Sequence, residues 1–246
     1  SVGTFRLPFA EIPANMVSNL LIPRMSVYEK ENKQKEIVTV WNESTRKASL
    51  FVVPLVVFLV VMAEEFIVTL FSKRYSDSAM IFAISAISLY PFTLRPSTII
   101  RAYADTKFMM YIGFIRIPVE IAVLYSLITF FGIQGAVVGA LVTMTLERAV
   151  YLFRASLLLG LPVYSMMPWK ALARTVVFSC VAGFPLLLIK THVQNSFLSL
   201  CVAGFVFILA YVPIGWSFGL FTNQDKRLIG EMRRKYVGRL VHVFSH

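Results

Sequence analysis

The fold is decided by two apolar runs that follow one another directly: FMMYIGFIRIPVEIAVLYSLITFF (residues 108–131) and IQGAVVGALVTMTLERAVYLFRASL (residues 133–157). Each run exceeds the roughly 20 residues that an α-helix needs to cross a bilayer. Only Gly132 separates them, and glycine accepts the backbone conformations of tight turns. The pair therefore predicts a helical hairpin inside a membrane.

The same hydropathy extends over the rest of the chain. Hydrophobic residues make up 57% of the 246 positions and charged residues 15%, against about 45–50% and about 25% in average globular proteins. The runs are continuous and do not alternate as strands of a membrane barrel do. We predict an all-α polytopic membrane protein with seven transmembrane helices, at about 1–26, 48–71, 78–100, 108–131, 133–157, 171–189 and 197–221.

The basic residues give this arrangement an orientation. Of the 24 lysines and arginines, 17 fall on one side, on every second connection and on the tail. Four fall on the other side, and Arg95, Arg116 and Arg148 lie inside helices. Cytoplasmic loops of membrane proteins are enriched in lysine and arginine. We therefore expect the C-terminus in the cytoplasm. The net charge of +11 reflects topology, and we expect no nucleic-acid partner.

The first helix carries a polar stripe. Thr4, Glu11, Asn15, Ser18 and Asn19 share about a third of its circumference. A carboxylate near the bilayer centre costs about 2.5–3.5 kcal/mol on insertion scales, so this face meets water or protein. A wall of a polar cavity and a helix–helix contact through small polar residues both fit.

Charged residues inside the later helices allow two interpretations each. Arg95 either faces a cavity or extends to the inner headgroups. Arg116 and Glu120, at i and i+4, either form a structural pair or provide an anion-binding arginine with a protonatable partner. Glu147 and Arg148 are adjacent and point to different sides, so one is expected to face inward and the other to reach the surface.

Two further segments have a clear physical reading. Gly135 and Gly139 form a GxxxG pattern, which favours close helix approach. Residues 222–246 form a basic amphipathic tail, which either lies on the anionic inner leaflet or is solvated. The predicted organisation is 1–160 as one group of helices, 161–221 as two additional helices, and 222–246 as a cytoplasmic tail.

Four stretches resemble one known family: VGTFRLPFAEIPANMVSNLLIPRMSVYEKENKQKEI (2–37), WNESTRKASLFVVPLVVFLVVMAEEFIVTLFSKRYSDSAMIFAI (41–84), IIRAYADTK (99–107) and LITFFGIQGAVVGAL (127–141). They are similar to the polysaccharide (O-antigen repeat-unit) flippases of the multidrug/oligosaccharidyl-lipid/polysaccharide exporter superfamily. The resemblance covers residues 1–160 and is one of hydropathy and turns.

The resemblance implies a two-lobe, alternating-access flippase of a bacterial cytoplasmic membrane, with this chain as its eighth to fourteenth helices. Because the chain opens on Ser1 without a signal peptide, we expect it to be the C-terminal part of a longer polypeptide whose N-terminal lobe is a partner. The implied substrate is a polyprenyl-pyrophosphate-linked oligosaccharide for lipopolysaccharide or another surface polysaccharide. Ion coupling to H⁺ or Na⁺ is implied, without another cofactor, and the expected partners are membrane lipids and polysaccharide-assembly proteins.

The resemblance also selects candidate site residues. The eighth helix lines the cavity in this family, which favours Arg6, Glu11 and Asn15 as substrate-binding residues. Arg95 and Arg116, with Glu120, are second candidates, because guanidinium groups bind pyrophosphate well. Glu11 departs from a purely anion-binding site, and a coupling or gating role suits its carboxylate.

Three other functions remain open. A cationic-drug exporter of the same superfamily needs an acidic cavity, whereas the candidate residues mix arginine with glutamate. A membrane glycan polymerase or ligase, which would be an enzyme, needs a long outer loop, and the outer connections predicted here are short. A non-transporting scaffold predicts that charge substitutions leave export unchanged. We expect a transporter and not an enzyme.

We predict that positions 6, 11 and 116 face one water-accessible cavity. Cysteines placed singly at these positions, in a chain whose native Cys180 and Cys201 are replaced by serine, should react with a membrane-impermeant thiol reagent. If no position reacts, the cavity hypothesis is wrong.

Overall fold

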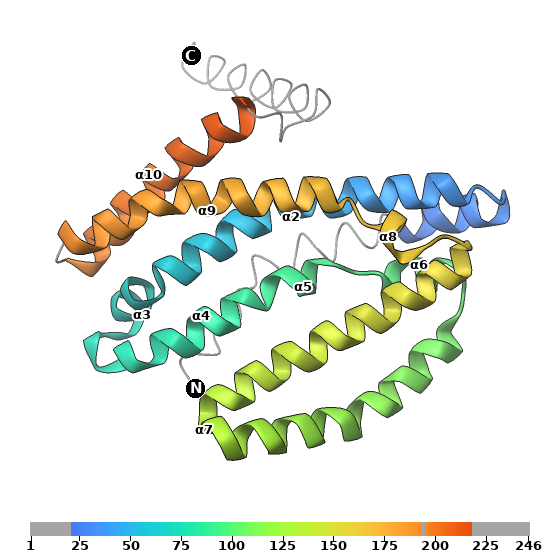
Figure 1. Ribbon diagram of the computed structural model, residues 1–246, viewed down its shortest axis with the longest axis horizontal. Coiled ribbons are helices and arrows are strands. Elements are labelled where there is room, and N and C mark those ends of the chain that lie inside the picture. Colours follow the sequence, from blue (N-terminus) through green and yellow to red (C-terminus); the bar gives the residue numbers. More distant parts are fainter. Residues whose placement is uncertain (1–20, 193–194, 218–246) are drawn as a thin grey trace, which may run out of the picture.

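The computed structural model describes residues 21–192 and 195–217, and every regular element in this part of the chain is helical (Figure 1). Residues 21–30 are helical, whereas residues 1–20, with Arg6, Glu11 and Asn15, lie outside the described part. The whole predicted tail, 222–246, and most of the first predicted helix therefore remain predictions.

The elements are α2 (Gln34–Val61), α3 (Ala63–Phe71), the 3-10 helix η2 (Lys73–Ser78), α4 (Ala79–Ile87), α5 (Leu89–Thr93), α6 (Ser97–Ala102), α7 (Thr106–Leu159), α8 (Val163–Met166), α9 (Trp169–His192) and α10 (Ser196–Ser217). Four described segments are long and apolar enough to cross a membrane: α2, α7, residues 169–190 of α9, and α10. The part of the chain that the structure describes is thus all-helical, and the protein is a multi-pass membrane protein. The number of seven crossings stays a prediction.

The helix that the sequence places at 48–71 is longer and is broken once. It begins at Gln34, and only residues 31–33 separate it from the preceding helix. The stretch expected as a connection is amphipathic, and its apolar residues Ile37, Val38 and Trp41 are buried against α6, α8 and the ends of α7 and α9. Met62 interrupts the helix between α2 and α3.

The single helix predicted at 78–100 is instead three short helices, α4, α5 and α6. Leu94 is extended, with φ −76° and ψ 105°, and Pro96 follows Arg95. Pro96 has no N–H to bond the carbonyl of residue 92 four positions earlier, and its ring would clash with that carbonyl in a continuous helix. Hydropathy alone does not reveal this break, which places Arg95 between α5 and α6.

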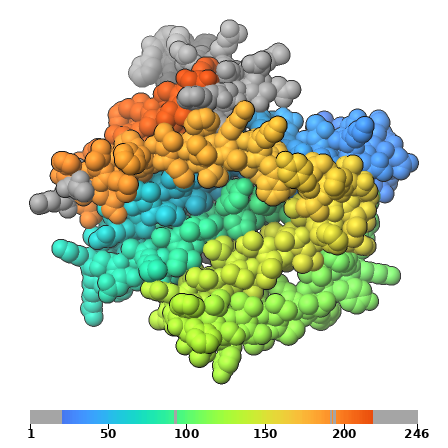
Figure 2. Space-filling view, in the orientation of Figure 1, coloured from blue at the N-terminus to red at the C-terminus, as the bar shows by residue number. Residues whose placement is uncertain are grey.

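Helix α7 is a hairpin of two legs, which Figure 1 shows at the edge of the molecule furthest from α10. The chain reverses at Gly132, where the sequence places the turn, and Gly132 has φ 60° and ψ −141°. We call residues 106–131 the first leg and residues 133–159 the second leg. No residue from 106 to 134 is buried, and the first leg forms the outer rim of the molecule in Figure 2.

The buried residues of α7 all lie on the second leg, and most recur at every fourth position: Gly135, Gly139, Thr143, Tyr151, Ala155 and Leu159. Residues four apart lie on one face of a helix. Near the turn this face packs on the first leg, because a Cβ atom at Gly135 would collide with the Leu127 carbonyl, and one at Gly139 would lie 3.0 Å from a Leu124 methyl group. The two glycines therefore bring the legs together.

Helix α2 is held by side chains of the last two helices. Pro54 lacks the N–H that would bond the Leu50 carbonyl one turn earlier. The Tyr211 hydroxyl of α10 donates to that carbonyl at 3.0 Å. At the break after α2, Lys190 of α9 donates to the Val61 carbonyl at 3.1 Å and lies 3.4 Å from the Glu65 carboxylate.

We predict that Gly135→Ala destabilises the hairpin by about 1–3 kcal/mol, the usual cost of overpacking a close contact. Gly113→Ala is the matched control, because a Cβ atom at this first-leg position meets nothing within 4 Å. It should stabilise the protein by up to about 1 kcal/mol through helix propensity. Thermal unfolding of both purified variants measures the difference. Equal stabilities would contradict the close approach at Gly135.

Candidate functional site

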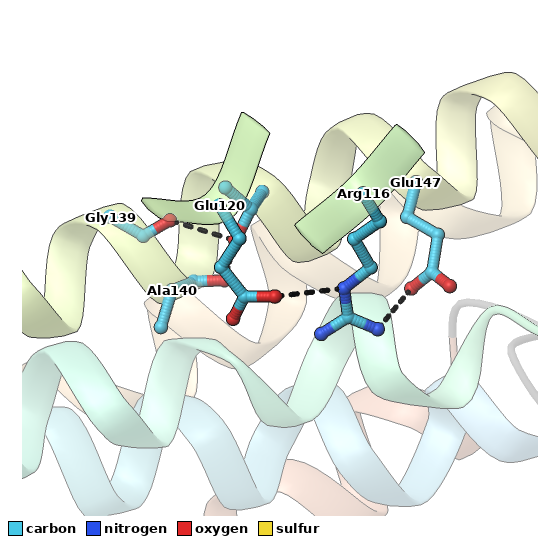
Figure 3. Close-up of polar contacts among 6 residues, drawn as sticks. Arg116, Glu120, Gly139, Ala140 and Glu147 are labelled. Carbon is cyan, nitrogen blue, oxygen red and sulfur yellow. Dashed lines mark hydrogen bonds and ion pairs between the residues drawn. The ribbon is translucent and has the colours of Figure 1, made fainter. Parts of the chain in front are cut away.

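Charged residues meet halfway along the α7 hairpin (Figure 3). The Arg116 Nε donates to Glu120 Oε2 at 3.1 Å, and its Nη1 donates to Glu147 Oε2 at 3.3 Å. Arg148 follows Glu147 on the second leg. We call these four residues the α7 charge cluster.

The hairpin geometry explains why these residues meet. Arg116 precedes the Gly132 turn by 16 positions and Glu147 follows it by 15, so both lie about 23 Å from the turn at 1.5 Å per residue. Glu120 is one helical turn from Arg116. Glu147 lies four residues after Thr143 and four before Tyr151, so it is on the same helix face as the buried residues of the second leg and faces inward with them.

Burial differs among the ion-paired residues. The side chains of Arg116 and Glu120 are 40% and 31% exposed, whereas that of Glu147 is only 13% exposed. Glu147 also belongs to the opposite leg, so its contact joins the two legs and the Glu120 contact does not. The guanidinium of Arg116 is thus engaged by two carboxylates.

Arg148 differs from the other arginines of α7. Its Nε is buried and has no hydrogen-bond partner, and no ion pair of Arg148 occurs among residues 21–192 and 195–217. The sequence leaves open which of Glu147 and Arg148 faces inward. The structure places Glu147 in the inward stripe and encloses the Nε of Arg148 as well.

A second ion pair closes the open end of the hairpin. Arg154 on the second leg contacts one Asp105 carboxylate oxygen through Nη2 at 2.7 Å and through Nε at 2.8 Å. Its guanidinium also lies 5.0 Å from the centre of the Phe108 ring. The legs are therefore joined by glycines near the turn, by charges midway and by Arg154 at the far end.

The structure brings together only some of the predicted site residues. Arg116 and Glu120 are in contact, while Arg95 lies on a different element, at the α5–α6 break. Arg6, Glu11 and Asn15 lie outside the described residues. The contact of Glu147 with Arg116 is not among the predicted contacts, although the buried residues at every fourth position of the second leg contain the signal. Among the described residues, no group of three histidine, cysteine or acidic side chains could hold a metal ion.

Removing one carboxylate at a time should separate these contacts. We predict that Glu147→Gln lowers the free energy of unfolding by about 1–3 kcal/mol, because the hydrogen bond between the legs loses the negative charge of its acceptor. Glu120→Gln should cost less, since Glu120 is more exposed and lies on the same leg as Arg116. Glu43→Gln is the control. It breaks the exposed Glu43–Lys47 pair on α2 and should cost at most about 0.5 kcal/mol. Equal losses at positions 147 and 120, measured by thermal unfolding, would contradict an inter-leg role.

Comparison with known proteins adds the family. The family model of the lipid II flippase MurJ matches residues 2–209. The comparisons with curated proteins and with solved structures give no significant match. The matched residues include every described helix up to the middle of α10, and with them the complete α7 hairpin and its charge cluster. Because the match covers most of the chain, this protein belongs to the MurJ family of flippases, which act on lipid-linked precursors.

Proposed function

We propose that this protein carries lipid II, or a closely similar polyprenyl-pyrophosphate-linked precursor, from the inner to the outer leaflet of the bacterial cytoplasmic membrane. The match of residues 2–209 to the lipid II flippase family carries this proposal. It favours lipid II over the O-antigen repeat unit that the sequence resemblance suggests, because the family is described by lipid II.

The α7 charge cluster fits a polar headgroup that crosses the membrane. It lies about 23 Å along each leg from the turn, in a hairpin whose remaining surface is largely apolar. Charged side chains inside membrane segments typically face a bundle interior or a water-filled pathway. We place the pathway beside the α7 charge cluster, together with Arg95 and with Arg6, Glu11 and Asn15 of the predicted first helix.

The proposed orientation follows from the charge distribution. The 17 basic residues that the sequence groups on one side favour a cytoplasmic C-terminus. Transport by alternating access also needs an N-terminal lobe that faces this one across the cavity. The proposal includes coupling to H⁺ or Na⁺ and polysaccharide-assembly proteins as neighbours in the membrane.

The composition of the cluster argues against export of cationic drugs. A cavity for cations needs an excess of carboxylates, whereas the α7 charge cluster holds two arginines and two glutamates. A headgroup that bears phosphates meets guanidinium groups favourably.

Reconstitution in vesicles tests the proposed function. We predict that the purified protein moves fluorescent lipid II from one leaflet to the other, measured as loss of protection from a membrane-impermeant quencher. Glu147→Gln should slow this by about tenfold, the effect of about 1.4 kcal/mol on a rate. Arg74→Gln, at an exposed position of η2, should behave as wild type.

A second substrate makes the test specific. A lipid-linked O-antigen repeat unit should move more slowly than lipid II in the same vesicles. Faster movement of the O-antigen substrate would indicate that the protein transports surface-polysaccharide precursors instead of lipid II. Movement of neither substrate would contradict a flippase function.

A further inference from the structure

Arg148 has no counter-charge of its own in the described structure. Arg116 contacts two carboxylates and Arg154 contacts Asp105, but Arg148 has no ion pair within residues 21–192 and 195–217. Its Nε is buried and without a hydrogen-bond partner.

The nearest carboxylate along the chain is already engaged. Glu147 Oε2 accepts a hydrogen bond from Arg116 Nη1 at 3.3 Å, and Glu120 is bound to the same guanidinium. The two carboxylates carry two negative charges and Arg116 carries one positive charge, so one negative charge is left over. The positive charge of Arg148 balances it without a direct contact. The cluster is neutral overall, yet its second guanidinium keeps its donors available.

The position of Arg148 makes this arrangement unusual. Arg148 lies 11 residues before the end of α7 at Leu159, or about 16 Å from that end. Arginine is rare and costly at this depth, and a buried N–H without an acceptor adds to the cost. A guanidinium presents five donors in a planar fork that matches phosphate oxygens.

We propose that Arg148 binds a phosphate group of the lipid-linked substrate at the middle of the membrane, with Arg116 as the structural arginine of the cluster. This inference rests on the proposed function and names the residue that recognises the anionic part of the substrate. Arg116 and its two carboxylates fix the second leg, so the Arg148 guanidinium is held in place before the substrate arrives.

Binding to purified protein in nanodiscs tests this role. The probes are a short-chain polyprenyl pyrophosphate, the corresponding polyprenyl alcohol, and inorganic pyrophosphate. Arg148→Gln should weaken binding of the polyprenyl pyrophosphate by about tenfold or more, as expected for a lost charge-assisted contact, and leave the alcohol unchanged. Arg148→Lys should fall between, because it keeps the charge and loses the fork. Arg74→Gln, with the same charge change at an exposed site, should bind as wild type.

The ligand-free stability of the same variants gives an independent readout. Arg148→Gln should change the unfolding temperature little, because the removal of a buried donor that lacks a partner offsets the loss of its long-range attraction to Glu147. A clear loss of stability would show a structural counter-ion, such as Glu11 of the first helix, and would overturn the proposal.

The remaining outcomes separate the two proposals. If wild type does not bind the polyprenyl pyrophosphate, the proposed function fails. If wild type binds it and Arg148→Gln binds it equally well, only the role of Arg148 fails. An effect of Arg148→Gln confined to inorganic pyrophosphate would assign the site to a free anion and would also overturn the role in substrate binding.

Discussion

In the hydrocarbon core of a membrane, each backbone or charged group must find its partner within the protein, because water does not supply one. This constraint explains the long-range contacts of α2. Pro54 frees the Leu50 carbonyl, and the Tyr211 hydroxyl of α10 satisfies it. Lys190 of α9 donates to the last carbonyl of α2 and meets Glu65. The two C-terminal helices are thus attached to α2 by polar contacts as well as by the apolar packing around Leu186, Ala203 and Phe207.

The same constraint couples packing to charge in the α7 hairpin. A carboxylate within about 4 Å stabilises an arginine in the membrane, and Glu147 reaches Arg116 only because the legs lie close together. The close approach comes from Gly135 and Gly139, which leave room for Leu127 and Leu124 of the first leg. The small residues near the turn and the ion pair midway are therefore parts of one interface, which also explains why the first leg can be so exposed elsewhere.

The sequence predicts these features unequally. The Gly132 reversal and the Arg116–Glu120 pair follow from local rules, since a glycine between apolar runs and an i, i+4 pair need only neighbouring residues. The breaks do not follow from hydropathy: the helix ends at Leu94, two residues before Pro96, because a proline cannot continue a helix, and hydropathy does not register this. The contact of Glu147 with Arg116 joins residues 31 positions apart and requires that both lie at about the same distance from the turn along their legs. Periodicity gives the buried face of one leg but not its register against the other.

The alignment of the two legs of α7 against each other changes which arginine suits an anionic substrate. From sequence, Arg116 is the candidate, because its partner Glu120 is the only carboxylate that local spacing provides. In the hairpin Arg116 holds two carboxylates, and releasing them for a substrate would break the contact between the legs. Arg148 has no such contact within the described residues, so a phosphate can bind it without disturbing the hairpin. A flippase must bind its headgroup and release it again, and this favours an arginine whose other contacts do not change between the two states.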